Sequence, residues 1–135
     1  FLTLTPISTH TPPMAAEVAQ PEWQMVGEQF VTFYYQTFDT NRTGIAALYE
    51  AESMLTFEGQ QFMGPDAMAE KLVSHAFQTV TYQVTTVDCQ PSPGNGVVIF
   101  VIGQLLTDNE EHPMSFSQVF HLQQNASGAY FCFND

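Results

Sequence analysis

The sequence contains almost no positive charge. One lysine, Lys71, and one arginine, Arg42, stand against fourteen acidic residues in a chain of 135, for a formal net charge of −12. Binding to nucleic acid needs clustered Lys and Arg that displace counterions from the phosphates, and attachment to anionic lipid needs basic side chains as well. The charge balance therefore argues against nucleic-acid and membrane partners, and it favours a basic protein partner.

Cysteine is also scarce, and long apolar runs are absent. Cys89 and Cys132 form no CxxC or Cys/His spacing, so we expect small buried apolar residues of a reducing compartment, with a single disulfide as the alternative. No run approaches the roughly 20 apolar residues that span a bilayer. Residues 1–13 lack the basic start and apolar core of a secretory signal. We expect residues 1–13 to be non-native and residues 1–20 to form a mobile extension.

Apolar and aromatic residues, by contrast, are abundant. They make up 44% of the chain and include twelve Phe, five Tyr and one Trp, whereas 12% of residues are charged. A chain of this length buries roughly two thirds of its unfolded surface. This composition excludes general disorder and predicts one domain over residues 21–135.

Hydrophobic periodicity predicts three helices followed by strands. Apolar residues at a spacing of three and four, from Trp23 through Phe33 and Tyr34 to Phe38, indicate a long helix that begins at Pro21 and ends near Asp39. Short helices are expected around residues 45–49 and after residues 64–66. Strand patterns occupy residues 53–58, 60–63, 77–89, 96–107, 114–124 and 129–133.

This order of elements is typical of an α+β fold. Helices come first and adjoining strands afterwards, without a βαβ rhythm, so we expect the helices on one face of a strongly curved, mainly antiparallel sheet. A curled sheet that wraps around a long N-terminal helix leaves a cavity.

Two acidic segments are candidates for sites that recognise a binding partner. Glu58 lies between aromatic residues in LTFEGQQFMG (55–64), where Gly59 predicts a turn that carries the carboxylate to the rim of a pocket walled by Phe57. The alternative is a solvated turn acid beside core aromatics. Asp108 begins the acidic stretch DNEE (108–111) in a predicted loop between two long strands. Such clusters are commonly solvated loops, although a cationic partner would relieve their mutual repulsion.

Catalytic patterns are missing. The four histidines, at positions 10, 75, 112 and 121, have no partner that the sequence identifies, and no metal-ligand spacing, nucleophile elbow or phosphate-binding loop occurs. Tyr34, Tyr35 and Asp39 come nearest to an acid–base set, but tyrosines at helical spacing are more often core residues. We therefore expect no catalytic residue, no metal and no cofactor.

Several segments, taken in order, resemble the nuclear transport factor 2 family over about residues 22–135. They are FVTFYYQTFD (30–39), LTFEGQQFMG (55–64), EKL (70–72), VIGQL (101–105), SFSQVFHL (115–122) and FCFND (131–135). The resemblance implies a cone-shaped α+β fold and a homodimer formed through the sheets. It also implies a carrier that binds GDP-bound Ran and the FxFG repeats of nucleoporins, and that moves Ran from the cytoplasm into the nucleus through pore complexes at the nuclear envelope.

The resemblance also assigns roles to residues. In the family, an aromatic side chain of Ran enters the cavity while basic residues beside it pair with acids at the rim. The acids carried over are Glu58, Asp108 and one of Glu110 and Glu111, because the loop here is one residue longer. Phe57 and Phe77 match cavity-lining aromatics.

Trp23 matches the tryptophan implicated in FxFG binding, although a lid on the core is the alternative role for this side chain.

Two differences from the family are expected to weaken Ran binding. Phe57 stands where the animal proteins carry tryptophan, and the sequence stops at residue 135, before a final stretch with another cavity aromatic. Two other functions stay open. One is a cavity enzyme of the ketosteroid isomerase or dehydratase type, and the other is a dimeric scaffold that binds nucleoporins without Ran.

Overall fold

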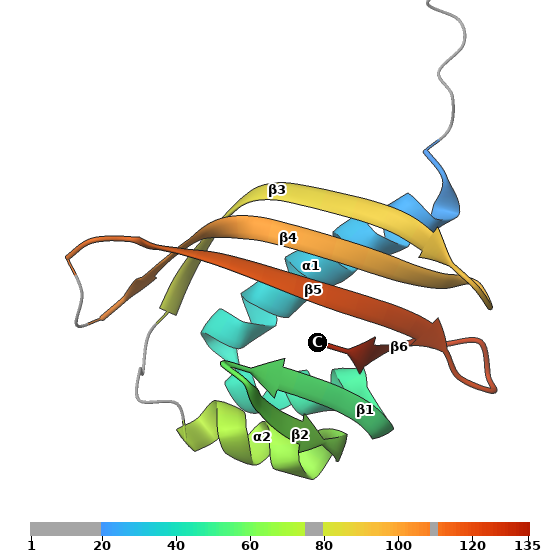
Figure 1. The fold of residues 1–135 in the computed structure, drawn as a ribbon, viewed down its shortest axis with the longest axis horizontal. Helices are drawn as coiled ribbons and strands as arrows, with labels where there is room; N and C mark the ends of the chain where they lie inside the picture. Colours follow the sequence, from blue (N-terminus) through green and yellow to red (C-terminus); the bar gives the residue numbers. More distant parts are fainter. Residues whose placement is uncertain (1–19, 75–79, 109–110) are drawn as a thin grey trace, which may run out of the picture.

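The computed structural model describes residues 20–74, 80–108 and 111–135 (Figure 1). The predictions for the mobile extension, for Phe77 and for Glu110 lie outside these residues, apart from position 20 of the extension. The elements, in chain order, are α1 (Glu22–Thr40), the 3-10 helix η1 (Arg42–Leu48), β1 (Tyr49–Phe57), β2 (Gln60–Met63), α2 (Gly64–Ser74), β3 (Val80–Ser92), β4 (Gly96–Thr107), β5 (Met114–Gln124) and β6 (Tyr130–Asn134).

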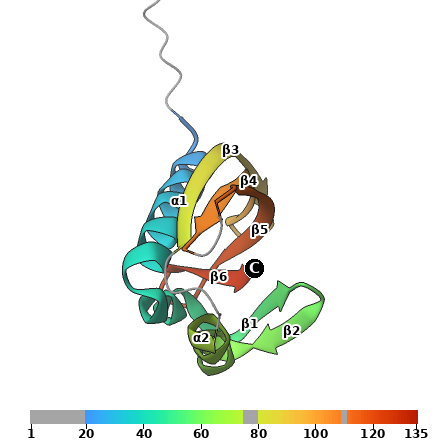
Figure 2. The same cartoon turned by 90° about the vertical axis from the view of Figure 1, so that its left-hand side faces the viewer.

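The six strands form one curved sheet in the order β2-β1-β6-β5-β4-β3. Every neighbouring pair is antiparallel except β1 and β6, which are parallel. Figures 1 and 2 show α1 lying along one face of β3, β4 and β5, while α2 lies beside β1 and β2 at the other end of the sheet. The predicted α+β fold, with a curved and mainly antiparallel sheet around a long helix, is confirmed.

Helix α1 follows the predicted bounds closely. Pro21 precedes it, and the Pro21 carbonyl accepts hydrogen bonds from the backbone N–H groups of Gln24 and Met25. The prediction that Phe33 lies on the buried face is wrong, because its side chain is 52% exposed while Tyr34 is 3% exposed. Successive residues lie about 100° apart around a helix, and the buried stripe of α1 runs through Val31, Tyr34, Tyr35 and Phe38, which leaves Phe33 on the opposite side.

Two other predictions need correction. The expected second helix is a 3-10 helix that ends at Leu48, and Tyr49 opens strand β1. In the sequence, Val80, Tyr82, Val84 and Thr86 alternate with Thr81, Gln83 and Thr85, which predicts that Thr86 shares a face with Val84, but a bulge between these two residues adds one position. Thr86 is therefore exposed, and Val87, which lies opposite Val101, packs against the core instead.

The core lies between α1 and the concave face of the sheet. Its fully buried side chains include Ile99 and Val101 of β4 and Phe120 of β5. Cys132 is buried and Cys89 is half-buried, and both are free thiols. No helix within the described ranges is long and apolar enough to cross a membrane.

Candidate functional site

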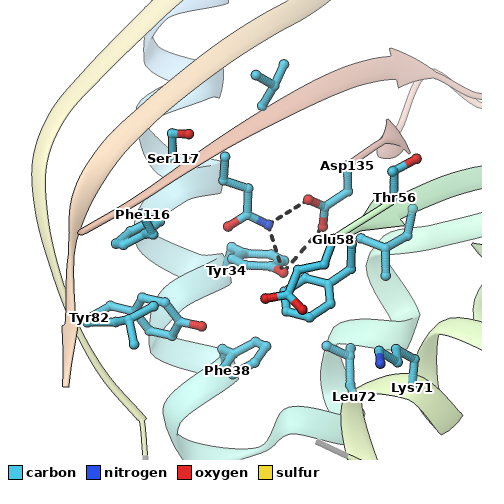
Figure 3. Close-up of a pocket in the computed structure, with 15 residues that line it drawn as sticks. Tyr34, Phe38, Thr56, Glu58, Lys71, Leu72, Tyr82, Phe116, Ser117 and Asp135 are labelled. Atoms are coloured by element: carbon cyan, nitrogen blue, oxygen red, sulfur yellow. Dashed lines mark hydrogen bonds between the residues drawn. The ribbon is translucent and has the colours of Figure 1, made fainter. Parts of the chain in front are cut away.

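A cavity of about 420 Å³ opens between α1, β1, α2 and the inner face of the sheet (Figure 3). Its size falls within the range of roughly 300–1,000 Å³ that is usual for ligand pockets. Five aromatic side chains from four different elements dominate its walls: Tyr34, Phe38, Phe57, Tyr82 and Phe116. A second hollow of about 390 Å³ shares four of these rings and also Glu58, so the two form one continuous region.

Glu58 lies where the sequence predicted it, in the turn between β1 and β2 and on the lining of the cavity. Phe57 pairs with Gln60 across the hairpin, and both turn residues have positive φ, 49° at Glu58 and 82° at Gly59. Such angles suit a tight two-residue hairpin turn, but they strain a residue that has a Cβ by about 1 kcal/mol. The turn therefore holds an exposed carboxylate at the rim, beside the Phe57 ring.

The acidic loop lies next to the second hollow. Asp108 directly follows Thr107, and Glu111 precedes Met114 by three residues; Thr107 and Met114 both line that hollow. Asp108 and Glu111 are both exposed. The structure thus places these two acids in the loop beside the aromatic region, although neither lines the cavity.

A polar network at the floor of the cavity was missed by sequence reasoning. The amide of Gln118 donates to Asp135 Oδ1 at 2.6 Å, the Tyr49 hydroxyl donates to Asp135 Oδ2 at 2.6 Å, and the Tyr34 hydroxyl donates to the same oxygen at 3.3 Å. Gln118 also donates to the Tyr34 hydroxyl at 3.2 Å and accepts from Tyr35 at 2.8 Å. Figure 3 shows Tyr34 and Asp135 close together in the cavity, with dashed lines that mark hydrogen bonds of this network.

Burial dominates the ionisation of this network. Desolvation raises the pKa of Asp135 above its ordinary value, although the hydrogen bonds from Gln118, Tyr49 and Tyr34 oppose the shift. Burial first, and the Asp135 carboxylate second, raise the pKa of Tyr34 well above its ordinary value. The tyrosines therefore stay protonated and donate their hydrogen bonds, while Asp135 accepts.

No local signal in the sequence could have found this network. Tyr34 and Tyr35 were noted together with Asp39, but Asp39 is exposed on α1. The carboxylate that Tyr34 does contact is Asp135, which lies 101 positions away and follows the last residue of β6. Only the tertiary fold, which packs α1 against the end of β6, brings the two side chains together.

The two cationic side chains of the sequence both lie over aromatic rings at one end of the cavity. Lys71 Nζ is 5.4 Å from the centroid of the Phe57 ring and 5.6 Å from that of Phe62. Arg42 Cζ is 4.8 Å from the centroid of the Phe38 ring. These are distances at which a ring quadrupole attracts a cation.

Trp23 lies at a different place on the molecule. Its side chain is half-buried and packs against the core, and it lines a hollow of about 400 Å³ together with Pro91, Ser92 and Tyr130. This hollow shares no lining residue with the aromatic cavity. A half-buried side chain at this position is compatible with both roles expected for Trp23, a lid on the core and a contact for FxFG repeats.

The model of the nuclear transport factor 2 domain family matches residues 26–135. Nuclear transport factor 2B of Arabidopsis thaliana is 47% identical over 87% of this chain and 94% of its own length, and nuclear transport factor 2 of Emericella nidulans is 49% identical over 84% and 92%. The solved structure of nuclear transport factor 2 from Cryptosporidium parvum superposes with a TM-score of 0.80 at 46% identity, over 86% of this chain and 93% of that one.

These relatives are named as transport factors and not as enzymes, which confirms the expectation of a non-enzymatic protein. The resemblance seen in the sequence extends to the fold, because the same α+β architecture is found in the solved relative. The chain belongs to the nuclear transport factor 2 family.

Proposed function

We propose that this chain is a nucleocytoplasmic carrier that binds GDP-bound Ran through its acid-rimmed aromatic cavity and FxFG nucleoporins through a separate patch at Trp23. Family membership supports a role in nuclear transport. The observation that carries the finer assignment is the position of Glu58 at the mouth of a cavity walled by aromatic rings. A protruding aromatic side chain flanked by basic residues is complementary to such a site. The protein would act in the cytoplasm, at pore complexes and in the nucleus.

The expected binding free energies indicate what an inserted aromatic ring and the acidic residues of the rim each contribute. Exposed ion pairs contribute roughly 0.2–1 kcal/mol each, so three of them fall short of the roughly 8 kcal/mol of a micromolar complex. Burial of an aromatic ring, with 150–250 Å² at about 25 cal/mol per Å², contributes roughly 4–6 kcal/mol before association costs. The cavity therefore provides most of the affinity, and the acids Glu58, Asp108 and Glu110 or Glu111 steer the approach and select the partner.

A pull-down with purified Ran tests this proposal. The protein is immobilised and offered Ran loaded either with GDP or with a non-hydrolysable GTP analogue. Retention of the GDP form alone is the expected result. Equal retention of both forms, or of neither, would contradict the carrier proposal, and retention of an FxFG peptide without Ran would support the scaffold alternative.

Trp23→Ala is expected to weaken binding of an FxFG peptide several-fold and to leave Ran binding unchanged. The reason is that Trp23 lines a hollow that has no residue in common with the aromatic cavity. Fluorescence anisotropy with a labelled FxFG peptide and calorimetry with GDP-loaded Ran measure the two affinities. Phe33→Ala, which removes another aromatic of α1 that does not line the Trp23 hollow, is the matched control. If both partners lose affinity for Trp23→Ala, the two-site arrangement is wrong.

The outer face of the sheet supports the proposed homodimer. Phe100, Ile102 and Val119 are 40%, 41% and 49% exposed on the face opposite α1, and Phe100 lies directly across from Val119 in the β4–β5 pairing. Neighbouring exposed apolar side chains on an uncovered sheet face favour association. The occupant that we propose is a second copy of the chain, packed sheet against sheet as the family resemblance implies. FxFG contacts, which are weak individually, then gain from two copies per dimer.

Phe100→Asp is expected to convert the dimer into a monomer. The substitution places a carboxylate at the centre of the apolar patch, and the two-fold symmetry of a dimer would bring two such carboxylates close together. Sedimentation equilibrium should then report the mass of one chain and not of two. Phe33→Asp, which makes the same exchange at an exposed aromatic of α1, should leave the mass unchanged. A dimer that persists in Phe100→Asp would show that another surface is used.

A further inference from the structure

The floor of the aromatic cavity offers a ligand an acceptor rather than a donor. The Gln118 amide already donates to Tyr34 and to Asp135, and the hydroxyls of Tyr34 and Tyr49 donate to Asp135. Tyr35 donates to the carbonyl oxygen of Gln118. The polar donors of the network are thereby engaged, whereas the Asp135 carboxylate still has lone pairs that can accept. This floor suits a cation or a hydrogen-bond donor, and it does not suit an anion or a carbonyl group.

The aromatic walls favour the same class of ligand. Five rings line the cavity, and the negative faces of aromatic π-systems attract cations, most strongly where water is excluded. The chain itself provides two examples, because Arg42 lies over Phe38 and Lys71 lies over Phe57. Aromatic residues arranged around a carboxylate form the kind of site that recognises quaternary ammonium groups.

The charges around the cavity add to this preference. Three charged side chains belong to its lining: Asp135 at the floor, Glu58 at the rim and Lys71 from α2. The residues that α1, β3, β4 and β5 contribute to the lining are uncharged, and Arg42 lies nearby, over the Phe38 ring. Asp135 is desolvated, so a cation that enters the cavity would regain part of the solvation that this carboxylate loses on burial.

We propose that the cavity binds a small organic ammonium ion of the trimethylammonium class, with its cationic head among the aromatic rings and facing the Asp135 carboxylate. The ligand uses the cavity of the proposed carrier function, but the inference does not require that Ran binds there. A ligand in this place would compete with any aromatic side chain that a protein partner inserts.

Choline and 3,3-dimethylbutan-1-ol form a matched pair of probes. The two molecules have the same shape, but the alcohol carries a neutral carbon in place of the quaternary nitrogen. Choline is expected to bind at least about tenfold more tightly, because only the cation gains from the rings and the carboxylate. NMR titration, with the tyrosine ring resonances as the readout, measures both affinities. Equal affinities, or no binding of choline up to its solubility limit, would overturn the proposal.

Three variants are expected to change the affinity for choline in stated directions. Asp135→Asn should abolish choline binding, and Glu58→Gln should weaken it about two-fold or more. Lys71→Met should strengthen it several-fold, because it removes a competing cation from the rim and keeps an apolar side chain there. Circular dichroism checks that Asp135→Asn is folded; if it is not, Lys71→Met and Glu58→Gln decide by themselves. Weaker binding in Lys71→Met would contradict the proposal.

The pH dependence provides an independent readout. Choline binding should fall as the pH is lowered through the raised pKa of Asp135, since the protonated carboxyl carries no charge. Glu58→Gln should keep this profile. An affinity that stays constant on acidification of the folded protein would overturn the role of Asp135. Ran pull-downs with the same proteins separate the two hypotheses, because either activity can be lost while the other persists.

Discussion

Glu58→Lys is expected to abolish binding of GDP-bound Ran while the protein stays folded. Glu58 lies at the mouth of the cavity, where the tight hairpin turn holds its side chain in solvent. The substitution replaces an attractive charge with a repulsive one and places a second ammonium group near Lys71. Juxtaposed like charges cost several kcal/mol in an interface, so the dissociation constant should rise by about a hundredfold or more.

The stability of Glu58→Lys should change little. Position 58 is exposed, and glutamate and lysine both have a Cβ. The strain that the positive φ causes at this position is therefore the same before and after the exchange. Calorimetry with GDP-loaded Ran measures the affinity, and thermal unfolding measures the stability. Glu52→Lys, which makes the same charge change at an exposed position of β1 outside the cavity lining, should bind Ran almost normally. Unchanged affinity in Glu58→Lys would reject the role of this carboxylate.

Phe120→Ala is expected to lower the free energy of unfolding by about 3–5 kcal/mol. The Phe120 side chain is fully buried, and its ring centroid lies 4.7 Å from that of Tyr34 and 5.1 Å from that of Phe30. Its loss would leave a void between α1 and β5 that the neighbouring rings cannot fill. Since the total free energy of unfolding of a small domain is about 5–15 kcal/mol, this one change would remove a large share of the stability. Urea unfolding followed by circular dichroism measures it.

Phe33→Ala is the matched comparison for this core substitution. Phe33 is 52% exposed on α1, so the same truncation there should cost less than about 1 kcal/mol. A similar loss of stability in both variants would show that the core does not centre on Phe120. Because periodicity in the sequence assigned Phe33 to the buried face, the measurement also checks that correction.

The sequence predicted the architecture well, since long periodic segments and turn residues carry most of the information. The bounds of α1, β4 and β5 agree closely with the structure, because glycine, proline and acidic residues mark their ends. The turn at Glu58 was also predicted correctly, because Gly59 occupies a position with positive φ. The predictions of element type that were wrong, such as the helix expected at Tyr49, concern short segments in which packing outweighs local propensity.

The sequence by itself determined the charge balance, the α+β order of elements, the aromatic supply of the cavity and the position of Glu58 in a turn. Only the tertiary structure decided that Asp135 meets Tyr34 and Tyr49 at the floor of the cavity. It also decided that a bulge in β3 turns Val87 inward. The physical reason is that hydrophobic period and turn chemistry act over a few residues, whereas the contacts of a buried carboxylate depend on how a curved sheet brings together strands that are distant in the chain.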